Sequence, residues 1–141
     1  MNTGRGSGTR KLSDVRRVLI VDDNHDSAEL LALLLRREGH ETRVAHDGEE
    51  AIRVALTFCP NIAFLDIGLP GIDGYELLDI LRVCPELPGC KFVAVSGREE
   101  LCPDSGAPVF DAYLLKPIDL DAVVRLVLEL AQPAMAKPAS A

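Results

Sequence analysis

The stretch Asn61–Gly74, NIAFLDIGLPGIDG, decides the fold of this chain. Its first residues are mostly apolar and predict a strand buried on both faces, because the run is too short for a helix and ends at a carboxylate. That carboxylate is Asp66, and the glycines and proline that follow it are typical of a loop. Asp66 is therefore expected at the carboxyl edge of a sheet, where open α/β proteins bind ligands. The alternative interpretation is that Asp66 only caps a turn.

Strands and helices alternate along the rest of the chain. The predicted strands are 17–21, 41–45, 61–66, 91–95 and 111–115, and the predicted helices are 26–38, 47–57, 73–83 and 119–131. Asp73 and Glu76 have the spacing of a capping box at the start of the third helix. The alternation indicates a doubly wound parallel sheet, and the common solution for five repeats is the flavodoxin-like (βα)5 fold with strand order 2-1-3-4-5.

Composition limits the possible classes of protein. A length of 141 residues with 48% hydrophobic residues is typical of one domain, expected at 15–131 between disordered segments 1–14 and 132–141. A net charge of −7 without a basic run argues against nucleic-acid binding, and no apolar run is long enough to span a membrane. The four cysteines lack metal-site spacing, so we expect reduced thiols in a cytoplasmic protein. The histidines, His25, His40 and His46, are assigned no role.

The predicted strand order brings five polar side chains to one edge of the sheet. They follow or end strands 1, 3, 4 and 5: Asp22, Asp23, Asp66, Ser96 and Lys116. Three adjacent carboxylates need a compensating cation, and oxygen ligands with open positions favour Mg²⁺. Lys116 and the Ser96 hydroxyl would stabilise an added phosphoryl group, for which an aspartate is a known type of nucleophile. Taken singly, each of these residues is equally typical of a turn or a solvated surface.

The chain resembles the receiver domain of two-component response regulators from about Val15 to Ala131. The matching pieces are VLIVDD, DGEEA, FLDIGLPGIDG, FVAVSG and AYLLKP. The resemblance implies that Asp66 accepts a phosphoryl group from a phosphohistidine of a histidine kinase or a histidine phosphotransfer protein. It also implies that the chain catalyses only its own phosphorylation and dephosphorylation, and is not otherwise an enzyme.

The resemblance also implies a role for each neighbour of Asp66. Asp22 and Asp23 would hold Mg²⁺ together with Asp66 and the backbone carbonyl of Gly68. Lys116 would pair with the phosphoryl oxygens, and the peptide bond between Lys116 and Pro117 would be cis. Ser96 and Tyr113 match the hydroxyl and aromatic switch positions of the family, which would move on phosphorylation and change the binding of partners.

One segment departs from the family pattern. Between Ser96 and Lys116, where a full fourth helix is usual, the sequence contains Pro103, Gly106 and Pro108. Proline inside a helix costs about 3 kcal/mol or more. We therefore expect a shortened or broken fourth helix, with one or two turns around 98–101, and the usual receiver dimer through this region is in doubt.

Apolar residues on the first helix exceed what a core requires. We expect Leu30, Leu31, Leu34 and Leu35 to form the buried stripe, which leaves Ala28, Ala32 and Leu33 near Asp66. These three are either scattered exposed residues or a docking surface for the phosphoryl donor.

Two other functions stay open at this stage. The chain could be a receiver that only binds partners, although its complete set of polar residues argues against this. It could instead be a Mg²⁺-dependent phosphohydrolase, but such enzymes carry a second acid two residues after the nucleophile, where this chain has Gly68. The sequence is either a stand-alone receiver or one taken from a longer protein.

Overall fold

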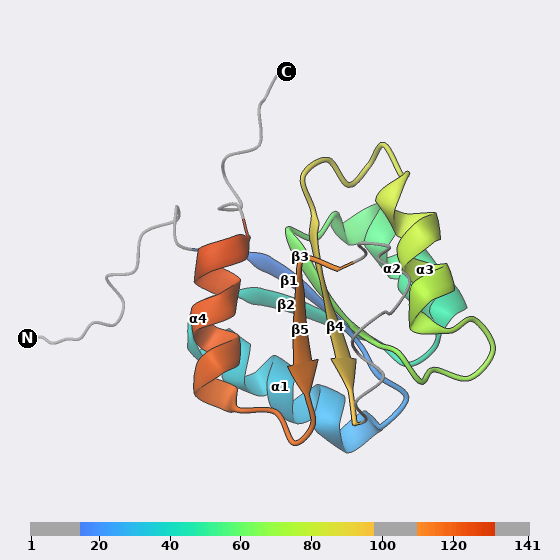
Figure 1. Cartoon of the computed structure of the whole chain (residues 1–141). Coiled ribbons are helices and arrows are strands. Elements are labelled where there is room, and N and C mark those ends of the chain that lie inside the picture. The colour runs from blue at the N-terminus through green and yellow to red at the C-terminus, as the bar shows by residue number, and fades with distance from the viewer. Residues whose placement is uncertain (1–14, 98–109, 132–141) are drawn as a thin grey trace, which may run out of the picture.

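The computed structural model describes residues 15–97 and 110–131, which form a parallel sheet between two layers of helices (Figure 1). The strands are β1 (Arg17–Val21), β2 (Glu41–Ala45), β3 (Ile62–Asp66), β4 (Lys91–Ser96) and β5 (Ala112–Leu115). The helices are α1 (His25–Arg37), α2 (Gly48–Phe58), α3 (Gly74–Arg82) and α4 (Leu120–Leu130). The strand order is β2-β1-β3-β4-β5 with every pair parallel, so the predicted order is confirmed.

The central strands are buried on both faces and divide the core in two. In β1, Leu19 and Val21 pack towards α2 and α3, whereas Val18 and Ile20 pack towards α1 and α4. Figure 1 shows the two pairs of helices on opposite faces of the sheet. All five residues of β3 are buried, as the continuous apolar run before Asp66 predicts. The sheet therefore holds the end of β3 rigidly.

Helix α3 begins where the capping box predicts. The Asp73 side chain accepts hydrogen bonds from the backbone N–H groups of Tyr75 and Glu76, and the Glu76 side chain accepts one from the Asp73 N–H. Gly74 also donates its N–H to the Ile67 carbonyl at 3.2 Å. The loop after Asp66 is thereby tied to the start of α3.

The prediction for the face that α1 buries is confirmed for Leu31 and Leu35 and is wrong for Leu30 and for the two alanines. Leu30 is 57% exposed, whereas Ala28 and Ala32 are 1% and 0% exposed. The helix approaches the sheet along a face that contains both alanines together with Leu31 and Leu35, because small side chains permit close packing. The apolar residues that α1 leaves in solvent are therefore Leu30 and Leu33, the latter 51% exposed.

Several predictions lie outside the described residues. They concern the shortened fourth helix, the dimer surface at 98–109, and the terminal segments 1–14 and 132–141. The helix labelled α4 follows β5 and corresponds to the predicted helix 119–131. Within the described ranges, no helix has the length and apolar character that crossing a bilayer requires.

Candidate functional site

The candidate site lies at the carboxyl edge of the sheet. Asp22 directly follows β1, Asp66 and Ser96 are the last residues of β3 and β4, and Lys116 directly follows β5. Because all strands run in the same direction, these positions meet at one edge. The register between β3 and β4 is consistent with this, since Asp66 pairs with Val95, the residue before Ser96.

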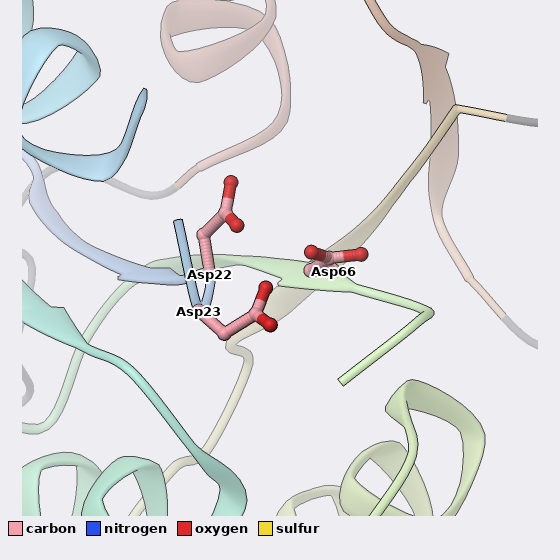
Figure 2. Close-up of side chains that lie close together, drawn as sticks. All are labelled: Asp22, Asp23 and Asp66. Atoms are coloured by element: carbon pink, nitrogen blue, oxygen red, sulfur yellow. The ribbon is translucent and has the colours of Figure 1, made fainter. Parts of the chain in front are cut away.

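Three carboxylates gather at this edge. Carboxylate oxygens of Asp22, Asp23 and Asp66 lie within 4.8 Å of one another, and Figure 2 shows the side chains from the end of β1 beside Asp66. Asp22 and Asp66 are only 6% and 8% exposed, whereas Asp23 is exposed. A partly buried set of oxygen donors with one open side suits a hard divalent cation such as Mg²⁺, which retains some of its water ligands.

Lys116 lies between two of these carboxylates. Its Nζ is 3.4 Å from Asp22 Oδ2 and 3.4 Å from Asp66 Oδ2. Burial alone would lower the pKa of Lys116, but the carboxylates of Asp66 and Asp22 outweigh it and raise this pKa above its ordinary value. The ammonium group therefore stays charged and offsets part of the negative charge of the site.

The Asp66 side chain is held by the loop that follows it. The backbone N–H of Gly68 donates a hydrogen bond to Asp66 Oδ1 at 3.0 Å. Burial raises the pKa of the Asp66 carboxyl above its ordinary value, and the Gly68 N–H and the Lys116 ammonium offset this rise only in part. An ionised Asp66 is therefore costly in this setting without further positive charge.

The other sequence-predicted residues lie on β4, on β5 and just after β5. Ser96 is 8% exposed, and its carbonyl accepts the Lys116 N–H at 2.8 Å. The peptide bond between Lys116 and Pro117 is cis. Tyr113 pairs with Ala94 of β4, and its ring packs edge-on against Phe110 with centroids 5.7 Å apart.

Two residues that the sequence did not single out border the site. The Nδ1 of His46 lies 3.0 Å from the Asp22 carbonyl oxygen, and the His25 ring stacks on the His46 ring. The β1–β2 register explains their position, because Val21 pairs with Ala45 and so Asp22 and His46 leave adjacent strand ends. No local motif in the sequence predicts this contact between residues 24 positions apart.

Comparisons with known proteins show which proteins the chain is similar to. The family described as "Response regulator receiver domain" matches residues 18–128. The DNA-binding response regulator MtrA of Mycobacterium tuberculosis is 35% identical over 104 residues, which are 72% of this chain and 44% of MtrA. An uncharacterized 14.6 kDa protein of Leptolyngbya boryana is 34% identical over 113 residues, which cover 78% of this chain and 86% of that protein. The chain thus spans less than half the length of the MtrA relatives.

A solved structure has the same fold. The CheY-like response regulator receiver domain from Methylobacillus flagellatus matches with a TM-score of 0.76 and 31% sequence identity. The match covers 82% of this chain and 98% of that domain. Here the similarity extends over nearly the whole of the other molecule.

Proposed function

Because the chain belongs to the response regulator receiver domains of two-component systems, we propose that Asp66 accepts a phosphoryl group from a phosphohistidine. The observation that carries the proposal is the position of Asp66 beside Lys116 and two further carboxylates at the end of a buried strand. A histidine kinase or a histidine phosphotransfer protein would supply the group. A carboxylate oxygen of Asp66 forms the new bond to phosphorus while the P–N bond of the donor breaks. The electron pair stays on the imidazole nitrogen, which takes up a proton.

Each residue around Asp66 has its own role in the phosphoryl transfer. The Gly68 N–H holds Asp66 Oδ1, so Oδ2 on the side of Lys116 is the oxygen that attacks. As charge develops on the phosphoryl oxygens, the Lys116 ammonium exchanges its contact with Asp66 for one with them. The Ser96 hydroxyl, at the end of the next strand, donates a hydrogen bond to the same group and couples its arrival to Tyr113.

The carboxylate set fits a magnesium ion by its donor chemistry. Asp22, Asp23 and Asp66 would hold the ion, and the resemblance to the family adds the Gly68 carbonyl as a further ligand. When bound, Mg²⁺ supplies positive charge for the phosphoryl oxygens.

We further propose that the donor protein docks beside α1. A cavity of about 330 Å³ lies next to the site and is lined by Asp22 and Lys116 together with apolar residues including Leu30 and Ile118. Leu30 and Leu33 are both more than half exposed on the same helix. Such a surface suits an apolar helix that carries the phosphohistidine close to Asp66.

A pair of rate measurements tests the docking surface. Leu30→Asp and Leu33→Asp should slow phosphorylation by a protein donor at least ten-fold and leave phosphorylation by a small acyl phosphate unchanged. Val83→Asp is the matched control, because Val83 is 78% exposed at the end of α3. Equal rates with the protein donor in all four proteins, wild type included, would refute docking at this surface.

The phosphoacceptor role is tested with the protein, Mg²⁺ and a small acyl phosphate. Intact-mass spectrometry should show one added phosphoryl group that is stable to acid and labile to base. Asp66→Ala should abolish the adduct, whereas the control Asp79→Asn, at an exposed position of α3, should retain it. An unmodified wild-type protein would support a pure binding module, and continuous turnover of a phosphoester would support a hydrolase.

A further inference from the structure

The His46 ring bonds the backbone just beyond the end of β1. There the Asp22 N–H still donates to the Ala45 carbonyl at 3.0 Å, as in the ladder between β1 and β2. The next group along the chain, the Asp22 carbonyl, lies 3.0 Å from Nδ1 of His46. A carbonyl oxygen can only accept, so Nδ1 carries the proton and donates it. His46 therefore holds the peptide group that joins Asp22 to Asp23.

This peptide group lies between two of the three carboxylates of the site. Figure 2 shows the Asp22 and Asp23 side chains leaving consecutive positions at the end of β1. Asp22 is 6% exposed, and its carboxylate accepts the Asn24 N–H at 2.9 Å and contacts Lys116. Asp23 is exposed, so the place of its carboxylate depends mainly on its backbone. Rotation of the peptide would move the Asp23 oxygens away from those of Asp22 and Asp66, which now lie within 4.8 Å.

The His46 ring is itself held from two sides. The backbone N–H of His46 donates to Oε1 of Glu50, in the first turn of α2, at 2.9 Å. The ring of His25, the first residue of α1, stacks on the His46 ring with centroids 3.6 Å apart and planes 4° from parallel. The stacking restricts rotation of the His46 ring and keeps Nδ1 directed at the carbonyl. His46 is half-buried, so water competes for this hydrogen bond from one side only.

We propose that His46 is a positioning residue for the magnesium site: its Nδ1–H fixes the peptide between Asp22 and Asp23 and so raises the affinity of the three carboxylates for Mg²⁺. The inference rests on the Mg²⁺ site proposed above and goes beyond it, because His46 supplies no ligand atom. It arranges two oxygen donors before the ion arrives, which reduces the free-energy cost of ordering them on binding.

The expected effect is smaller than that of a residue bonded to a ligand atom. Hydrogen-bond partners of metal-ligating side chains typically contribute about 10–100-fold to metal affinity. His46 acts through the backbone carbonyl of Asp22 instead, so its hydrogen bond should contribute roughly three- to ten-fold.

Two substitutions of equal shape isolate the hydrogen bond. Asparagine and leucine branch in the same way at Cγ, but only asparagine has an N–H, at the position that Nδ1 occupies in histidine. His46→Asn should therefore retain the bond to the Asp22 carbonyl, and His46→Leu should lose it. Titration of the full chain with Mg²⁺, followed in ¹H–¹⁵N amide spectra, gives the affinity without any phosphoryl donor. Spectra without Mg²⁺ report the bond itself, because the Asp23 nitrogen shares a peptide group with that carbonyl.

His46→Leu should weaken Mg²⁺ binding roughly three- to ten-fold, whereas His46→Asn should stay within about two-fold of the wild type. The Mg²⁺ concentration for half-maximal labelling of Asp66 by a small acyl phosphate should rise by the same factor in His46→Leu. The labelling rate at saturating Mg²⁺ should change by less than about two-fold, because the ion then holds the carboxylates in place.

The outcomes separate this inference from the proposed function. A His46→Leu protein with wild-type affinity would overturn the role of His46 alone. Weakening that His46→Asn shares in full would also overturn it, because shape and not the hydrogen bond would then be responsible. A wild-type protein that binds no Mg²⁺ would overturn this inference together with the proposed magnesium site.

Discussion

Replacing Gly74 with alanine tests how the loop after Asp66 is held. A Cβ built at Gly74 would lie 2.8 Å from Ile67 Cα and 3.0 Å from the Asp66 carbonyl oxygen. Both atoms belong to the backbone, so no side chain can rotate away from the added methyl group. To lengthen the distance between this Cβ and Ile67 Cα from 2.8 Å to an ordinary 3.4 Å, α3 or the loop must move by about 0.6 Å.

Two opposing effects determine how much Gly74→Ala changes the free energy of unfolding. Overpacking of this kind costs about 1–3 kcal/mol. Replacing glycine with alanine inside a helix stabilises the helix by at most about 1 kcal/mol, and Gly74 is at the first position of α3. We therefore expect Gly74→Ala to lower the free energy of unfolding by about 1–2 kcal/mol. The same shift would misplace the Asp66 carboxylate and slow its phosphorylation.

Urea unfolding followed by circular dichroism measures the stability change. Gly68→Ala is the matched control in the same loop, because the nearest heavy atom to its added Cβ is Asp66 Oδ1 at an ordinary 3.8 Å. That variant should keep the wild-type stability or exceed it slightly, since alanine restricts the unfolded chain. A Gly74→Ala protein as stable as the Gly68→Ala protein would refute the reasoning from the backbone contact.

Three further predictions follow from contacts of charged and buried groups. Lys116→Met removes the ammonium between two carboxylates and should slow labelling by a small acyl phosphate at least ten-fold. The control Lys91→Met should be labelled at the wild-type rate, and equal rates for the two variants would contradict the role of Lys116. Arg16→Gln loses hydrogen bonds to two carbonyls at the end of α4, at 3.1 and 3.2 Å, and should lower the unfolding free energy in urea by about 2–3 kcal/mol. Burial raises the pKa of Cys90 to about 12, so iodoacetamide at mildly alkaline pH should label Cys84 and spare Cys90 in peptide mass maps. Labelling of both thiols at one rate would contradict this.

The order of elements and the membership of the carboxylate cluster could be predicted from the sequence. Each apolar run is followed by a polar residue, and the alternation of strands and helices restricts the sheet to few topologies. Asp22, Asp23 and Asp66 could be placed together because parallel strands end at one edge, and the structure brings them within 4.8 Å. The capping box at Asp73 is equally local, because its partners are three residues apart.

Other contacts between distant segments were decided only by the tertiary structure. Helical periodicity shows that α1 has an apolar face, but close packing on the sheet selected Ala28 and Ala32 over Leu30. The stacking of His25 on His46 and the placement of Lys116 between two carboxylates depend on strand register, which pairs Val21 with Ala45 and Ser96 with Leu115. The sequence by itself determined which residues end each strand, because that depends on local patterns of hydrophobicity. Packing between elements decides which side chains make contact across those strand ends. The hydrophobic periodicities of strands and helices, two and 3.6 residues, do not encode these contacts.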